Sequence, residues 1–204
     1  LSSSSAASDV YKRQTHSYNK NVAHQLTFYA EDEMTLNEKW SLNGGVNADV
    51  FHISGKTFAT LSPRLSMKFQ PTERLSLKAS YTLMSQFVHK IANSYLDLPT
   101  DYWVPTTARL HPMRSWQVAA GAYMKPDKHW LLSLEAYYKH SSHILQYSSW
   151  AGLEPPAANW DYMVMEGNGR SYGIELDADY NVSNLTLHGS YTLSWTCLLY
   201  TSPS

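Results

Sequence analysis

The sequence predicts an all-β protein, an antiparallel up-and-down meander of about eight strands. Two observations lead to this prediction: apolar and polar residues alternate in one segment after another, and the connections between the segments differ in length in a regular order. The clearest alternation lies in residues 171–182, where Tyr172 and Leu176 share one face and Glu175 belongs to the other. Because side chains alternate across a strand with a period of two, this segment is expected to form a strand with one apolar and one polar face.

Eight segments show this alternation, and each is expected to form one strand. They are residues 22–34, 40–50, 59–70, 75–88, 116–124, 130–139, 171–182 and 185–195. Pro63 lies inside the third segment. Because proline has no N–H to donate to a neighbouring strand, we expect a bulge or an unpaired position there.

The order of the connections indicates what kind of sheet the strands form. The connections at residues 35–39, 71–73, 126–128 and 183–184 are tight, whereas those at 54–56, 89–113 and 146–168 include both long stretches. Long loops at one rim and tight turns at the other are typical of outer-membrane barrels. In a compact soluble domain, two loops of this length would count against the strand assignment unless they were functional.

Aromatic residues lie near both ends of the predicted apolar face. Trp40, Phe69, Trp130 and Tyr180 lie near the tight turns, and Phe87, Trp116, Tyr172 and Trp195 lie near the long loops. Two such groups match the aromatic girdles of a transmembrane barrel. The pattern therefore favours a transmembrane β-barrel over a soluble antiparallel sandwich, whose inner face would look similar.

The composition excludes several classes of protein. The chain has 204 residues, a net charge of -1, 15 tyrosines and 7 tryptophans, which is unlike a disordered or nucleic-acid-binding polyelectrolyte. It contains no apolar run of about 18 residues that would form a transmembrane helix. Apart from Cys197 it has no cysteine, which is compatible with an oxidising envelope compartment.

Both ends of the chain differ in pattern from the rest. Residues 1–14 show no starting Met, no signal-peptide core and no alternation, and they resemble translated adapter sequence. Residues 196–204 have the same character, because the alternation breaks after Trp195. We therefore expect non-native tails at 1–14 and 196–204 around a barrel segment at 15–195. A natural flexible tail is the alternative.

Three motifs resemble the barrel of TonB-dependent outer-membrane receptors. GNGRSYGIELDADY at 167–180 is similar to an entry strand of that barrel, FYAEDEMTLNEKWSLNGGVNADVF at 28–51 to a strand pair, and LSPRLSMKFQPTERLSLKASY at 61–81 to a further segment. The resemblance covers residues 22–195. It departs from the family at residues 47–49, where an arginine is usual, and the family's plug domain, energy-coupling box and aromatic-ended last strand are not in this sequence.

The resemblance implies a partial, open slice of a transmembrane outer-membrane β-barrel that has about 22 strands in full. It implies a receptor in the outer membrane of a Gram-negative bacterium that imports a scarce solute of the siderophore, cobalamin or glycan class. The implied partners are outer-membrane lipid, the missing plug domain of the same polypeptide, a TonB-type energy-coupling protein and a small solute ligand. No nucleic acid, cofactor or catalytic activity is expected. The alternative is a small, complete eight-stranded barrel acting as a passive channel or adhesin.

The predicted polar face carries charged residues that are expected to line the lumen. They are Arg64, Lys68, Lys78, Glu135, Lys139, Glu175, Asp177 and Asp179. Two interpretations remain open: a wall that contacts the plug or guides a solute, and a merely hydrated interior, which is the simpler one because barrel lumens are polar. If eight strands closed on themselves, these charges would be packed into a narrow interior at high desolvation cost, so an unclosed sheet with two free edges is expected.

The long loops hold the candidate residues for capturing a ligand. They are Tyr95, Asp97, Tyr102, Trp103, Arg109, His111, Arg114, Trp150, Trp160 and Tyr162. Rigid aromatic rings with a few charges suit a bulky ligand, although the same residues could simply shield the rim.

Two histidine patterns indicate neither a metal site nor an active site. His140 and His143 are three positions apart, which places them on opposite faces of a strand and makes joint chelation unexpected. His188 and Ser190 share the polar face, but no acidic third member or oxyanion donor is placed beside them.

Overall fold

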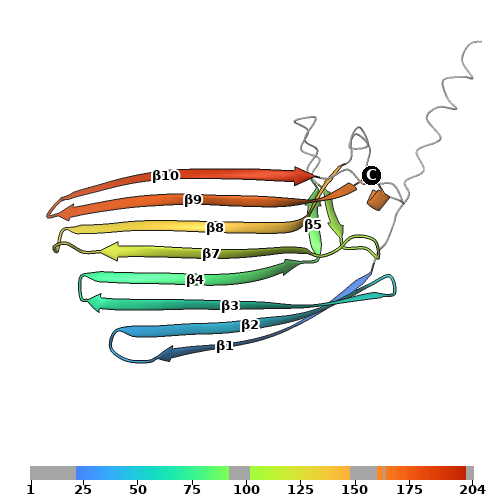
Figure 1. The fold of residues 1–204 in the computed structure, drawn as a ribbon, viewed down its shortest axis with the longest axis horizontal. Coiled ribbons are helices and arrows are strands. Elements are labelled where there is room, and N and C mark those ends of the chain that lie inside the picture. Colours follow the sequence, from blue (N-terminus) through green and yellow to red (C-terminus); the bar gives the residue numbers. More distant parts are fainter. Residues whose placement is uncertain (1–21, 92–101, 148–159, 163, 201–204) are drawn as a thin grey trace, which may run out of the picture.

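The computed structural model of the chain describes residues 22–91, 102–147, 160–162 and 164–200. Eight strands form one antiparallel sheet, in the order β1-β2-β3-β4-β7-β8-β9-β10 (Figure 1). Their bounds are β1 Ala23–Thr35, β2 Trp40–Ile53, β3 Lys56–Thr72, β4 Leu75–Gln86, β7 Met113–Met124, β8 Trp130–Tyr147, β9 Val164–Val182 and β10 Leu185–Tyr200. The predicted eight-stranded meander is therefore confirmed. No helix within the described ranges is long and apolar enough to cross a membrane.

The sheet is open. Each strand pairs with its neighbours in the sheet order, and β1 and β10 are the two edges. The turns that join β1 to β2, β3 to β4, β7 to β8 and β9 to β10 lie together at the left end of Figure 1, opposite the end that bears the longer connections. The expected free edges are confirmed, and the alternative of a closed eight-stranded barrel is wrong for this chain.

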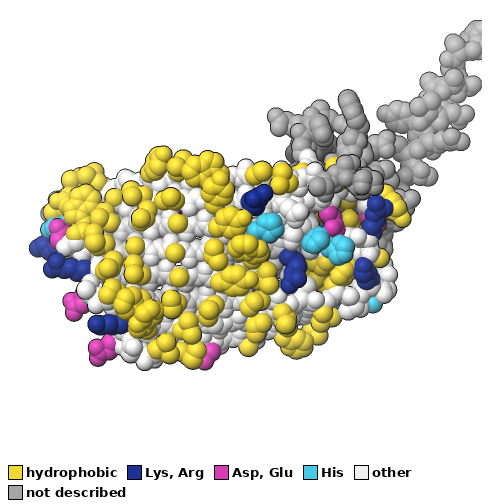
Figure 2. All heavy atoms as spheres, viewed as in Figure 1, with side chains coloured by type: hydrophobic (Ala, Val, Ile, Leu, Met, Phe, Trp, Pro, Cys, Tyr) yellow, Lys and Arg dark blue, Asp and Glu magenta, His cyan; other side chains and the backbone are white. Residues whose placement is uncertain are grey.

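One face of the sheet is apolar and uncovered. Leu77 lies opposite Ala122, which lies opposite Leu134, and Leu134 lies opposite Leu176, so one row of apolar side chains crosses four strands. The three leucines of this row are exposed. Figure 2 shows this face, on which yellow apolar side chains extend over the sheet while charged side chains lie near its ends. An exposed apolar surface of this extent requires an apolar surrounding.

Aromatic rings lie at both ends of the apolar face. Near the tight turns, Trp40 stacks on Phe69 with ring centroids 4.3 Å apart, and Trp130 lies 4.8 Å from Tyr180. Near the loops, a continuous ladder joins Trp116, Tyr138, Tyr172 and Trp195, with successive centroids 5.4, 6.3 and 5.4 Å apart. Both girdles are thus present, because the antiparallel register brings rings from neighbouring strands into contact.

Phe87 does not belong to the loop-side girdle, contrary to the prediction. It lies just after the end of β4, is 3% exposed, and stacks on Phe51 with ring centroids 4.8 Å apart. The chain leaves the large sheet at this point to enter β5 (Val88–Ile91), which pairs with β6 (Tyr102–Pro105) in a separate two-stranded sheet. The stretch 89–113 therefore contains strands that the sequence pattern did not indicate.

Several strands are longer at the loop-bearing end than the alternation predicted. The β8–β9 ladder continues to the pair Tyr147 and Val164. β10 continues past Trp195 as far as Tyr200, which lies opposite Gly167. Gly167 permits this approach, because a Cβ built on it would lie 2.3 Å from the Tyr200 ring. The pairing of residues 196–200 with β9 does not test whether 196–204 is adapter sequence, so that origin stays a prediction. Residues 1–14 lie outside the described part of the chain.

Pro63 lies where the pairing between β3 and β4 ends. It is opposite Val46 of β2, but the β3–β4 ladder begins only at Arg64. The expected unpaired position at the proline is therefore confirmed. The irregularity that β3 does contain lies elsewhere, between Phe69 and Thr72.

The first testable prediction concerns the apolar face. Leu176 lies midway between Tyr172 and Tyr180 of the two girdles, so Leu176→Arg should make folding into a bilayer less favourable by about 2–4 kcal/mol. The control Leu185→Arg, beside the tight turn of the same hairpin, should cost about 0–1 kcal/mol. The measurement is urea unfolding of the full-length parent protein in lipid vesicles. Equal costs at both positions would contradict a membrane-spanning sheet.

A second prediction uses two glycines of the β9–β10 hairpin. A Cβ on Gly173 would lie 2.9 Å from the backbone oxygen of Leu193 and 3.0 Å from the Tyr137 ring, whereas a Cβ on Gly189 would meet nothing within 4 Å. Gly173→Ala should therefore lower the free energy of unfolding by about 1–3 kcal/mol, because the backbone oxygen cannot move aside independently. Gly189→Ala should change it by less than about 0.5 kcal/mol. The same unfolding measurement compares them, and an equal effect would show that the two strands are not paired in this register.

Candidate functional site

The charged residues predicted to line the lumen share the face of the sheet opposite to the apolar one. At its β1 side, Arg64 of β3 forms an ion pair with Glu31 of β1, and Glu31 also accepts a hydrogen bond from Asn43 Nδ2 at 3.1 Å. Gly45 of β2 lies between them, and a Cβ there would be 2.7 Å from Arg64 Nε. The glycine therefore leaves the space through which Arg64 reaches across β2.

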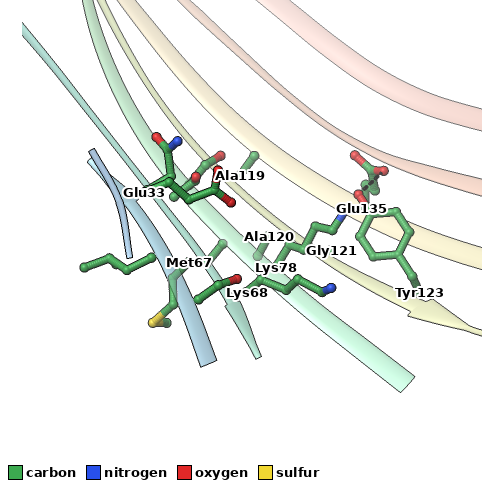
Figure 3. Close-up of a pocket in the computed structure, with 15 residues that line it drawn as sticks. Glu33, Met67, Lys68, Lys78, Ala119, Ala120, Gly121, Tyr123 and Glu135 are labelled. Atoms are coloured by element: carbon green, nitrogen blue, oxygen red, sulfur yellow. Dashed lines mark hydrogen bonds between the residues drawn. The ribbon is translucent and has the colours of Figure 1, made fainter. Parts of the chain in front are cut away.

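The middle of the polar face contains an open hollow of about 400 Å³. Its lining includes Lys68, Lys78, Tyr123 and Glu135, which come from β3, β4, β7 and β8 (Figure 3). Tyr123 donates a hydrogen bond from its hydroxyl to Glu135 Oε1 at 2.6 Å, and Lys78 Nζ lies 4.4 Å from the centroid of the Tyr123 ring. The Lys78 ammonium and the Glu135 carboxylate are thus both held in place by one tyrosine.

Two pairs of like charges lie directly opposite each other on this face. Lys68 lies directly opposite Lys78 on β3 and β4, and Glu135 lies directly opposite Glu175 on β8 and β9. Like charges that lie opposite each other in a sheet repel. Water or a partner of opposite charge can relieve this repulsion. Lys68 and Lys78 therefore form a basic patch at β3–β4, and Glu135, Glu175 and Asp177 form an acidic patch at β8–β9, where Lys139 of β8 also lies on this face.

Of the remaining residues of the predicted polar wall, Asp177 and Asp179 lie toward the tight-turn end of β9, and Lys139 lies at the middle of β8. Asp177 accepts a hydrogen bond from Ser133 Oγ at 3.3 Å, and Asp179 Oδ1 lies 2.7 Å from His188 Nδ1. Lys139 is opposite Ser171 on the same face. All eight positions thus lie on the polar face, as their alternation required.

The loop-bearing rim has a small apolar core of its own. Val104 of β6, Leu110, Leu145 of β8 and Val164 of β9 are buried together. Thr107 then ties this segment to the 3-10 turn η2 (Trp160–Tyr162): its hydroxyl donates to Asp161 Oδ2 at 3.3 Å and accepts from the backbone N–H of Leu110 at 3.3 Å. The rim is therefore a packed structure that fixes the side chains it carries.

The structure places several of the predicted loop residues. Arg109 lies over the Tyr162 ring, 4.2 Å from its centroid, and Tyr162 is 67% exposed. Trp103 of β6 is also exposed, and Arg114 lies at the start of β7, opposite Ser142. Tyr102 belongs to the backbone of β6 and Trp160 to that of η2. Tyr95, Asp97 and Trp150 lie outside the described residues.

His111 is the predicted loop residue with the most specific surroundings. Its backbone N–H donates to Glu166 Oε1 at 2.7 Å, and its Nδ1 lies 3.3 Å from Glu166 Oε2. His143 Nδ1 lies 2.7 Å from the same Oε2, and the two imidazole centroids are 4.9 Å apart. His111, His143 and Glu166 therefore form one cluster, with ligand atoms all within 4.8 Å of one another.

The sequence pattern missed two members of this cluster. His140 lies beside Trp116, with ring centroids 6.0 Å apart, whereas His143 meets a histidine from another segment. His143 occupies an irregular position of β8 between Ser142 and Ile144 and has a φ of 59°, a conformation uncommon for a residue with a Cβ. No motif in the sequence signals this bulge, and Glu166 lay within the stretch assigned to a loop.

A further histidine lies buried near the cluster. His89 of β5 is 3% exposed, and its Nε2 lies 3.1 Å from Thr106 Oγ1. Burial lowers the pKa of His89; the Glu166 carboxylate opposes this shift, and His143 adds to it. Because burial disfavours the charged form, His89 is held as a neutral side chain at neutral pH.

Comparisons with known proteins agree with this architecture. Residues 2–203 match the family model "TonB dependent receptor-like, beta-barrel". No curated protein matches the sequence. Among solved structures, the FrpB iron transporter from Neisseria meningitidis (F5-1 variant) is similar with a TM-score of 0.67 and 19% identity, over 98% of this chain and 31% of that one.

Two further structures resemble the chain. The alcaligin outer-membrane receptor FauA from Bordetella pertussis has a TM-score of 0.56 and 14% identity, over 87% of this chain and 31% of that one. The ferripyoverdine receptor of the outer membrane of Pseudomonas aeruginosa has a TM-score of 0.59 and 14% identity, over 89% of this chain and 24% of that one. The chain thus spans less than a third of the length of these structures, and at such identities the likeness is one of fold. Because the family model matches nearly all of the sequence, the chain belongs to the TonB-dependent receptor-like β-barrel family.

Proposed function

We propose that the chain is part of an outer-membrane receptor of a Gram-negative bacterium, which imports a scarce solute of the siderophore, cobalamin or glycan class. The family match over residues 2–203 carries this proposal. Solved structures with the same fold are described as an iron transporter, an alcaligin receptor and a ferripyoverdine receptor, that is, as transporters and receptors rather than enzymes. Those names support a role in solute import and do not identify the solute.

The two faces of the sheet support a position in the outer membrane. Lipid is the surrounding that satisfies the exposed row of Leu77, Leu134 and Leu176. The aromatic girdles at both ends of this face suit the two interfaces between lipid and water. Backbone pairing along the strands satisfies N–H and C=O groups that lipid could not. At the free edges of β1 and β10, further strands of the full barrel would continue this pairing.

The polar face supports contact with a plug domain of the same polypeptide. The basic patch, with Lys68 and Lys78, and the acidic patch, with Glu135 and Glu175, each place two like charges opposite each other. A plug with complementary charges would reduce both repulsions, and a charged solute passing the wall would do so transiently. Energy for import would come from a TonB-type coupling protein acting through that plug.

The loop-bearing rim supports capture of a ligand from outside. Trp103 and Tyr162 are exposed aromatic side chains, and Arg109 holds its guanidinium against the Tyr162 ring. This combination of rigid rings and a charge suits a bulky organic ligand. The other candidates proposed for this role are Tyr95, Asp97, Tyr102, His111, Arg114, Trp150 and Trp160.

The third prediction tests import. Cells that carry the full-length receptor gene should take up at least one of three radiolabelled probes, a ferric siderophore, cobalamin or a glycan, and the matched gene deletion should remove that uptake. An uncoupler that dissipates the proton gradient should abolish the same uptake, because import is coupled to energy. Uptake that persists with the uncoupler would instead indicate a passive channel.

The fourth prediction tests the orientation. Protease added to intact cells should cut the full-length receptor within residues 89–113 or 146–168, since exposed loops are the preferred sites of cleavage. The turns at 71–73 and 126–128 should stay intact until the cells are opened. Mass spectrometry of the fragments distinguishes the two, and cleavage confined to the turns would invert the proposed orientation.

A further inference from the structure

Within the described ranges, no other group on the polar face or the loop rim has the composition of the cluster of His111, His143 and Glu166. Two imidazoles and one carboxylate are the donor set of many zinc sites, and they bind other late divalent transition metals as well. We propose that these three residues bind a divalent transition-metal ion, for which Zn²⁺ is the probe. The inference does not depend on the solute that the receptor imports, because all three ligands belong to this chain.

The distances are close to those that a metal ion needs. Glu166 Oε2 lies 2.7 Å from His143 Nδ1 and 3.3 Å from His111 Nδ1. Ligands about 2.0–2.1 Å from a tetrahedral ion are roughly 3.3 Å apart. Small side-chain movements therefore suffice to bring the donor atoms around one ion.

The carboxylate is already oriented toward the imidazoles. The backbone N–H of His111 donates to Glu166 Oε1 at 2.7 Å, which leaves Oε2 directed at both rings. A hydrogen bond to the second oxygen of a ligating carboxylate fixes its direction in the way that outer-shell partners do in metal sites.

The backbone of β8 is shaped to present His143. The bulge between Ser142 and Ile144 departs from the regular register, and His143 has a φ of 59° within it. Ile144 after the bulge packs over Gly169, where a Cβ would lie 2.8 Å from Ile144 Cδ1. Bulges of this kind redirect a side chain near functional sites, and here the side chain that is redirected meets Glu166.

The cluster is accessible to an ion from solvent. The side chain of His111 is 61% exposed, that of His143 36% and that of Glu166 25%. Histidine side chains, drawn in cyan, gather at the loop-bearing end of the molecule in Figure 2. A bound ion would join three segments that lie far apart in the sequence: the residues before β7, the end of β8 and the start of β9. It would therefore act as a cross-link of the loop-bearing rim.

The fifth prediction is a metal-binding experiment on the full-length receptor in detergent micelles. Isothermal titration with ZnCl₂ should reveal a saturable site whose affinity falls by more than about 100-fold in His111→Ala and in Glu166→Gln, since loss of outer-shell partners alone costs 10–100-fold. The matched control is His188→Ala, which removes an imidazole with the same 2.7 Å contact to a carboxylate, Asp179, at the opposite rim. Its Zn²⁺ affinity should equal that of the parent.

The same samples also provide a control for correct folding of the variant. His111 lies outside the strands and is exposed, so His111→Ala should retain the strand signal of the parent in circular dichroism. Zn²⁺ should also slow amide exchange within residues 106–112 of the parent but not of this variant. Absence of Zn²⁺ binding in the parent, or equal affinity in His111→Ala and His188→Ala, would overturn the proposal.

Discussion

Pairing between neighbouring strands is the interaction on which the rest of this structure depends. The large sheet has no thick protein core, and among the described residues the buried apolar side chains lie in two small clusters at the loop-bearing end. Elsewhere the ladder of antiparallel pairs fixes the structure, from Ala23 opposite Ile53 at one edge to Tyr200 opposite Gly167 at the other. Such a sheet satisfies its backbone groups internally, which a lipid environment demands. The two faces of the sheet can then contact different surroundings.

The register decides what each face can do. On one face, an apolar row joins Leu77, Ala122, Leu134 and Leu176. On the other face, the same register places Lys68 opposite Lys78 and Glu135 opposite Glu175. The polar face thus places like charges opposite each other at two positions. Water screens this repulsion, and a partner of complementary charge at either patch would reduce it further.

The loop-bearing rim differs from the rest because tertiary packing, rather than alternation, organises it. Phe87 stacks on Phe51 of β2 instead of joining the aromatic girdle, the chain then enters the small β5–β6 sheet, and Leu110 packs with Leu145 and Val164. These contacts bring the segment of His111 onto β8 and β9. The most specific polar cluster of the chain therefore lies where the regular pattern of the sheet ends.

The sequence alone predicted the strands and the two faces, because a period of two and the order of tight and long connections are local properties. It also placed Arg64, Glu135 and the other charged residues on the polar face for the same reason. The family was indicated by three motifs that resemble its barrel, and the open sheet by that resemblance and by the charges that closure would bury. The sequence did not predict the girdle role of Tyr138, the burial of Phe87 or the cluster around Glu166. These depend on which residues of different strands become neighbours and on a bulge at His143, whose φ no sequence motif announces. Only the tertiary structure decides such contacts, because they arise from packing between segments that are distant in the chain.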